Sequence, residues 1–232
     1  DNPNQPLSMR FLSIVLILIV SAESAWAENT PLRVAALEFA ITPTTGGYTS
    51  SKTGARVAKV AGPLKTAVTL LEDGDTRLCL ITSHMNSPKG ANIAPLIRGA
   101  VAAALAMPIT HVLLMVSHNH TDLNLVSNHL EAYSTLLMKP EEIPTPKLEP
   151  VGEDFMRQLV ATAKQLPALL QPVTVWWAVG SENRISYNRK GRRPDGTAYL
   201  IREEDRDLLG ADFNSDIDTQ APIVVFKNER GE

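Results

Sequence analysis

Apolar residues are gathered in short runs that turn-forming residues separate, a pattern typical of β-strands. Leu32 to Phe39 is the first run, with Arg33 and Glu38 as its only charged members. Leu64 to Leu71 and Thr76 to Ser83 form a pair of such runs about an Asp-Gly turn. Two β-type runs that flank an Asp-Gly turn predict a hairpin.

A helix and another strand are expected next. Asn92 is placed to cap a helix over Ile93 to Ala106, an Ala-rich stretch that Met107-Pro108 ends. Val112 to Val116 is continuously apolar, which predicts a strand buried on both faces at the centre of an α/β sheet. A helix between two strands of one sheet predicts a right-handed crossover.

The second half of the chain continues the alternation of helices and strands. Phe155 to Leu166 has the apolar spacing of an amphipathic helix, and Pro172 to Gly180 and Ala221 to Phe226 have the composition of strands. If the first of these strands is regular, Trp176 and Trp177 face opposite sides of it, and core packing is favoured over a ligand wall for them. The expected fold class is α/β, with a layered mixed β-sheet core, flanking helices and an incomplete C-terminal part.

The first residues have the three regions of a secretory signal. Met9-Arg10 supplies a positive charge, Phe11 to Val20 is apolar except for Ser13, and Ala25-Trp26-Ala27 fits the cleavage pattern. We expect residues 9–27 to be a signal peptide cut after Ala27 and residues 1–8 to be upstream of it. An uncleaved anchor or a buried core helix is the alternative. The mature protein, residues 28–232, is expected to be secreted or periplasmic and to be the N-terminal part of a longer catalytic domain.

Charge and cysteine content narrow the class of protein. The formal net charge is −3 and no long basic run is present, so nucleic acid is not expected as a partner. Cys79 is the only cysteine of the chain, which excludes an internal disulfide.

Chemistry-bearing side chains follow the run at Val112 to Val116. His118 and His120 are two residues apart, so in an extended segment both imidazoles would face one ion or substrate. Asp122 continues the same alternation, and His84 follows the hairpin and is expected at the same edge of the sheet. His118 is therefore a candidate metal ligand, with His84 and Asp122 as weaker candidates. The alternative is that the histidines end a strand at a solvated surface and form local hydrogen bonds.

An ordered series of segments resembles the neutral, non-lysosomal ceramidase family over Leu32 to Glu232. The segments are Ala40-Ile41-Thr42-Pro43 with Gly46-Gly47-Tyr48, Gly62 to Ala67, the Ala-rich helix with Thr110 to His120, Asn188-Arg189 before an Asp-Gly turn, and Ile223 to Phe226. The family patterns that they resemble read DITP with GY, DPLYARA, VLVSATHTHSGP, NRR with DG, and VGVLRF.

This resemblance implies a zinc-dependent amidase that hydrolyses the N-acyl bond of ceramide or a related lipid amide, with contact to a membrane surface at its periphery. His118 corresponds to a zinc ligand of the family, and His120 corresponds to the histidine beside the metal-bound water and the reacting carbonyl. Arg189 corresponds to a loop arginine that helps to hold the site. Asn188, beside it, is expected to bind the substrate.

Two departures from the family pattern bear on function. Thr121-Asp122-Leu123 stands where the family has Ser-Gly-Pro, and His84 stands where the family usually has an aspartate. The resemblance also places the family's remaining zinc ligands and its serine beyond Glu232, so this chain is expected to be inactive alone. The alternative function is a secreted, non-catalytic binding domain with the same fold.

Overall fold

The computed structural model describes residues 31–42, 59–60, 62–86, 92–119, 124–128, 130, 138–185, 190–192, 195, 197–200 and 217–231. The chain divides into two compact units, Asp1–Leu170 and Gln171–Glu232. The predicted signal peptide at residues 9–27 lies outside the described residues. No helix in these ranges is long and apolar enough to cross a membrane.

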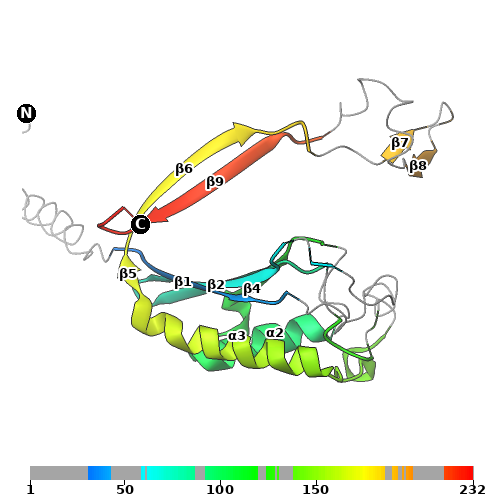
Figure 1. The fold of residues 1–232 in the computed structure, drawn as a ribbon, viewed down its shortest axis with the longest axis horizontal. Coiled ribbons are helices and arrows are strands. Elements are labelled where there is room, and N and C mark those ends of the chain that lie inside the picture. The colour runs from blue at the N-terminus through cyan, green and yellow to red at the C-terminus, as the bar shows by residue number, and fades with distance from the viewer. Residues whose placement is uncertain are drawn as a thin grey trace, which may run out of the picture. The chain divides into compact units, whose positions relative to one another are not determined.

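A mixed sheet with the order β4-β3-β2-β1-β5 is the largest element of the fold (Figure 1). Strands β1, β2 and β3 are antiparallel neighbours, whereas β3 and β4 are parallel. The bounds are β1 Arg33–Ala40, β2 Lys65–Asp73, β3 Thr76–Ser83, β4 Val112–Val116 and β5 Gln171–Pro172. The α/β fold class, the hairpin and the helical crossover between two parallel strands are therefore confirmed.

Two helices cover one face of this sheet (Figure 1). Helix α2, Ile93–Leu105, connects β3 to β4, and helix α3, Pro150–Leu169, extends the predicted helix at both ends. Short 3₁₀ turns lie at Ile109–His111 (η1) and Pro140–Glu142 (η3). The helices bury the alternate residues of the strands that face them, and these strand residues form the centre of the core: Ala35, Val68, Leu70, Cys79, Ile81 and Val112.

Strand β4 lies at an edge of the sheet, so the prediction of a central strand buried on both faces is wrong for the described sheet. Val112 is fully buried on the helix-covered face, but Leu113 and Met115 on the opposite face are both 44% exposed. A continuous apolar run does not distinguish a strand buried on both faces from one whose second face is apolar and open. Among the described strands, β4 pairs with β3 only.

Asn92 precedes helix α2 as predicted, but its side chain does not cap the helix. The backbone of Asn92 has φ −91° and ψ −27°, in the helical region, whereas a capping residue is normally extended. The side-chain Nδ2 donates instead to the carbonyl of Pro144. Asn92 therefore ties the start of α2 to the connection before α3.

The segment after the histidine motif is anchored to the start of helix α3. Val126 forms a β-bridge with Leu148, and the N–H of Glu149 donates to the carbonyl of Leu125 at 2.9 Å. Gly152 packs closely against the same carbonyl. A Cβ added at this position would lie 2.1 Å from the Leu125 oxygen, so a larger residue does not fit. The start of α3 therefore fixes the chain where it leaves the motif.

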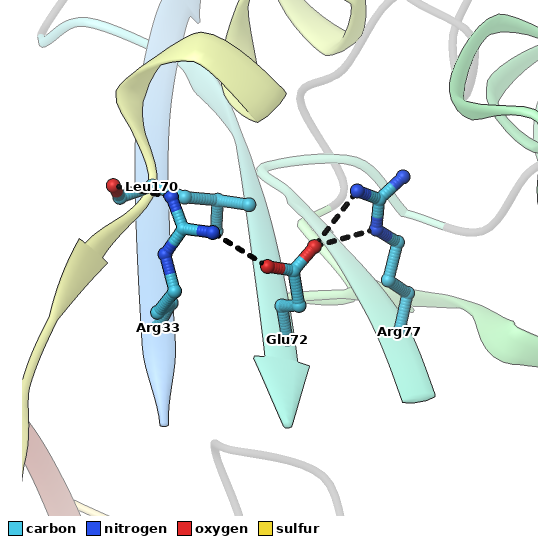
Figure 2. A network of polar contacts seen from close by, with 4 residues as sticks. All are labelled: Arg33, Glu72, Arg77 and Leu170. Atoms are coloured by element: carbon cyan, nitrogen blue, oxygen red, sulfur yellow. Dashed lines mark hydrogen bonds and ion pairs between the residues drawn. The ribbon is translucent and has the colours of Figure 1, made fainter. Parts of the chain in front are cut away.

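A charged network joins three strands at the end of the sheet opposite the histidines. Glu72 accepts from Arg33 Nη1 and from Arg77 Nε, both at 2.8 Å (Figure 2). Arg33 Nη2 also donates to the carbonyl of Leu170 at 3.2 Å, where α3 ends. The network therefore connects β1, β2 and β3 with the Leu170 carbonyl, directly after helix α3.

The described residues of the second unit form two small antiparallel sheets. The strand bounds are β6 Thr174–Ser181 paired with β9 Gln220–Lys227, and β7 Lys190–Arg192 paired with β8 Ala198–Leu200. Both predicted strands of this region are confirmed. Trp176 and Trp177 are 60% and 77% exposed, so the core packing that the sequence favoured is not present among the described residues.

Candidate functional site

The carboxyl ends of β3 and β4 bring two loops together. In the parallel register Ser83 lies beside Val116, and the N–H of Ser117 donates to the carbonyl of Ser83 at 3.0 Å. The N–H of Asn119 donates to the carbonyl of Met85 at 3.1 Å. The two chain segments therefore stay hydrogen-bonded beyond the strands, at the edge where open α/β sheets place their ligands.

His118 lies on the second of these segments in a conformation that suits a metal ligand. Its Nδ1 is 3.2 Å from the carbonyl oxygen of Asn86. A carbonyl oxygen only accepts, so Nδ1 carries the hydrogen and the lone pair of the neutral ring is on Nε2. Histidines that bind metals usually donate their second ring N–H to a carbonyl or carboxylate in this way. The ring of His118 is therefore held in the tautomer that binds a metal through Nε2.

The backbone of His118 is left-handed, with φ 57°. The extended geometry that the sequence suggested for this segment is therefore interrupted at His118. Left-handed backbone in a residue other than glycine is uncommon and is found preferentially at functional sites. His120 and Asp122 lie outside the described residues, so their approach to His118 stays a prediction from the sequence.

His84 lies at the same edge, as predicted, but its hydrogen bonds differ from those of His118. The backbone N–H of Lys65 donates to His84 Nδ1 at 3.3 Å, and the N–H of His84 donates to the Lys65 carbonyl at 3.0 Å. Because Nδ1 accepts, the hydrogen of this imidazole is on Nε2. A ring nitrogen that carries hydrogen is a donor, so this arrangement does not suit His84 as a metal ligand.

A hollow of about 430 Å³ opens beside these loops. One row of residues across β1, β2, β3 and β4 contributes to it, and the register places Glu38, Ala67, Thr82 and Met115 in this row. The side chains of Lys65 and Glu38 form an ion pair. The residues that line the hollow are Glu38, Lys65, Ala67, Thr82, Ser83, His84, Met115, Val116 and Ser117.

Sequence reasoning did not find the contributions of Glu38, Lys65, Thr82 and Asn86 to this region. Their participation depends on strand register, which pairs Glu38 with Ala67 and Ala67 with Thr82. The hydrogen bond from His118 to Asn86 likewise depends on two loops that are 32 residues apart in sequence. In the sequence, only the hairpin pattern indicated that the strands that carry Lys65 and Thr82 are neighbours.

Two further predicted site residues precede strand β7. Asn188 and Arg189 lie outside the described residues, immediately before β7. In the loop that follows β7, the side chain and backbone of Thr197 donate to Asp195 Oδ1 at 2.7 Å and 2.9 Å, which lowers the pKa of the Asp195 carboxyl. Within the described ranges, no three His, Cys, Asp or Glu side chains are grouped closely enough to hold a metal ion.

The structure is that of an α/β protein with a histidine-bearing loop at the carboxyl ends of two parallel strands. No family model matches the chain, and no curated protein matches it in sequence. A solved ceramidase complexed with C2 is similar in structure, with a TM-score of 0.53 and 18% identity. Neutral ceramidase from Pseudomonas aeruginosa is also similar, with a TM-score of 0.50 and 18% identity.

Each of these similarities covers 87% of this chain and 30% of the solved chain. The chain therefore spans less than a third of the length of these structures. The resemblance to the ceramidase family is confirmed at the level of the fold.

Proposed function

We propose that this chain supplies part of the metal site of a zinc-dependent hydrolase that cleaves the N-acyl bond of ceramide or a related lipid amide. The observation that carries the proposal is the hydrogen bond between His118 Nδ1 and the Asn86 carbonyl, which orients Nε2 for a metal. The similarity of the fold to two solved ceramidases supports the choice of reaction.

The donor set at the carboxyl ends of β3 and β4 fits zinc in part. His118 would hold the ion through Nε2, and the Asn86 carbonyl would fix the orientation of the ring. Catalytic zinc usually has three protein ligands, so the proposed site requires further ligands from outside the described residues. Bound zinc would lower the pKa of its water to about 7 and polarise the amide carbonyl.

His120 and Arg189 have roles in the proposal that follow from the family resemblance. An imidazole and a guanidinium beside the reacting carbonyl would donate hydrogen bonds to the oxygen as negative charge develops on it. Asn188 would contact the substrate next to Arg189. These three residues lie outside the described residues, and mutation of each one tests its role separately.

The proposal is tested by hydrolysis of a fluorescent short-chain N-acyl sphingosine by a purified full-length protein that contains this chain, because the chain spans about 30% of the solved ceramidases and is expected to be inactive alone. We expect activity to disappear after dialysis against a chelator and to return with Zn²⁺ but not with Mg²⁺, which prefers oxygen ligands. His118→Ala should abolish the activity that zinc restores, whereas His111→Ala should retain it, because His111 lies in η1 at the other end of β4. Absence of zinc-dependent hydrolysis would contradict the proposal and favour a non-catalytic binding domain.

A further inference from the structure

His84 provides a hydrogen-bond donor at the rim of the hollow. The backbone N–H of Lys65 donates a hydrogen bond to His84 Nδ1 at 3.3 Å. Because Nδ1 accepts, the hydrogen of the ring is on Nε2. The ring lines the hollow, and its side chain is exposed. The N–H of His84 also donates to the Lys65 carbonyl at 3.0 Å, and this bond fixes the position of the residue. The hollow therefore has a donor whose direction is set by the strands.

The charges that line the hollow cancel one another. Lys65 and Glu38 form an ion pair, and both residues line it. His84 is counted as neutral, as in the formal net charge of the chain, and its Nδ1 accepts from the Lys65 N–H. The lining side chains therefore carry no net formal charge, which favours an uncharged ligand over an ion.

The remaining lining is partly apolar. Ala67, Met115 and Val116 supply an apolar surface, and Met115 is 44% exposed although it belongs to a strand of the main sheet. Thr82 and Ser117 add hydroxyl groups beside it. A surface with apolar and hydrogen-bonding parts and no net charge is complementary to a neutral amphipathic molecule.

The hollow adjoins the proposed metal ligand. Ser117, which lines the hollow, directly precedes His118, and His84 is two residues before Asn86, which orients the His118 ring. We propose that the hollow binds the uncharged polar group of the amphipathic substrate, with His84 Nε2–H donating to one of its hydroxyl or carbonyl oxygens. This inference rests on the proposed function, because it assigns the hollow to the substrate of the same site.

Two substitutions separate the hydrogen bonds of the imidazole. In His84→Asn the amide oxygen retains an acceptor near Nδ1 for the Lys65 N–H, but no donor reaches the place of Nε2. In His84→Gln the amide nitrogen retains a donor near Nε2, and the acceptor for Lys65 is lost. The probes are N-octanoylethanolamine, which is uncharged, and octanoate, which has the same acyl chain and a negative charge. Their binding to the purified protein is measured by calorimetry.

We expect the wild type to bind N-octanoylethanolamine more tightly than octanoate. His84→Asn should weaken binding of the uncharged probe by roughly fivefold to tenfold, which corresponds to the loss of about one hydrogen bond. His84→Gln should bind it within about twofold of the wild type. Equal binding by His84→Asn and the wild type, or equal binding of the two probes, would overturn the inference.

Bound zinc, measured in the same preparations, separates this inference from the proposed function. Both His84 variants should retain the zinc content of the wild type, and a loss of zinc in both would overturn the inference by making His84 a ligand. If zinc binding does not depend on His118 but probe affinity still depends on His84, the proposed metal site fails and the ligand site stands. If zinc binding depends on His118 and probe affinity does not depend on His84, the inference alone fails.

Discussion

His118 and His84 show how the partner of one ring nitrogen decides what the other can do. His118 donates from Nδ1 to a carbonyl, which places the lone pair of the ring on Nε2. His84 accepts at Nδ1 from a backbone N–H, which leaves a donor on Nε2. The two residues lie at the same edge of the sheet, yet only His118 is held as a metal ligand is usually held.

Gly152 is a residue whose replacement should have a large and local effect. Gly152→Ala is expected to lower the free energy of unfolding by about 2–3 kcal/mol, because the added Cβ would overlap the Leu125 carbonyl. Gly99→Ala is the matched control, since its Cβ would meet only Ile109 Cδ1 at an ordinary 3.8 Å. The control should raise stability by up to about 1 kcal/mol, as alanine is favoured over glycine inside a helix. Denaturant unfolding of the two variants checks both values.

A Gly152→Ala protein as stable as the wild type would show that the segment after the histidine motif is not fixed by the start of α3. In that case Leu125 would have room to move away from the helix, and the anchoring of the motif described above would be wrong.

Strands β3 and β4 and the loops after them are the elements that build the site. Their parallel pairing continues as hydrogen bonds from Ser117 to Ser83 and from Asn119 to Met85, so the two loops cannot separate without breaking these bonds. Arg98 Nε, from helix α2, donates to the carbonyl of Val112 at 2.7 Å and holds the start of β4 against the helix. The edge position of β4 therefore does not leave the histidine loop without support.

The three strands joined by Glu72 provide a test at the same scale. Glu72→Gln should lower the free energy of unfolding by about 1 kcal/mol, because the carboxylate contacts two guanidinium groups that are themselves about 40% exposed. Glu38→Gln removes a more exposed carboxylate from the same sheet and should cost less than about 0.5 kcal/mol. Thermal or denaturant unfolding compares the two. A larger loss in Glu38→Gln would contradict the assignment of Glu72 as the strand-linking residue.

For the whole molecule, local patterns in the sequence predicted the elements better than their arrangement. The Asp-Gly turn and the Ala-rich stretch gave the hairpin and α2, because turn chemistry and helix propensity act within a few residues. The edge position of β4 depends on pairings between distant residues, which a continuous apolar run does not encode. The exposure of Trp176 and Trp177 also depends on the wider arrangement, since an apolar strand pattern does not specify its cover.

The candidate site was predictable in part for the same reason. The position of His118 was predicted from a strand that is followed by histidines. The structure places His118 just beyond the carboxyl end of β4. The hydrogen bond to Asn86 and the hollow beside Lys65 depend on strand register and were not predictable from spacing. Local conformation also mattered, because the left-handed backbone at His118 interrupts the alternation on which the two-histidine prediction rested.

Zinc binding by His118 is the most direct test of the account. The zinc content and zinc affinity of the wild type, His118→Ala and His111→Ala are measured in a full-length protein that contains this chain, by elemental analysis and by competition with a chromophoric chelator. The wild type and His111→Ala should bind zinc equally, and His118→Ala should bind it at least about 100-fold more weakly, more than the loss of an outer hydrogen bond to a metal ligand costs. Equal zinc affinity in His118→Ala and the wild type would show that His118 is not a metal ligand.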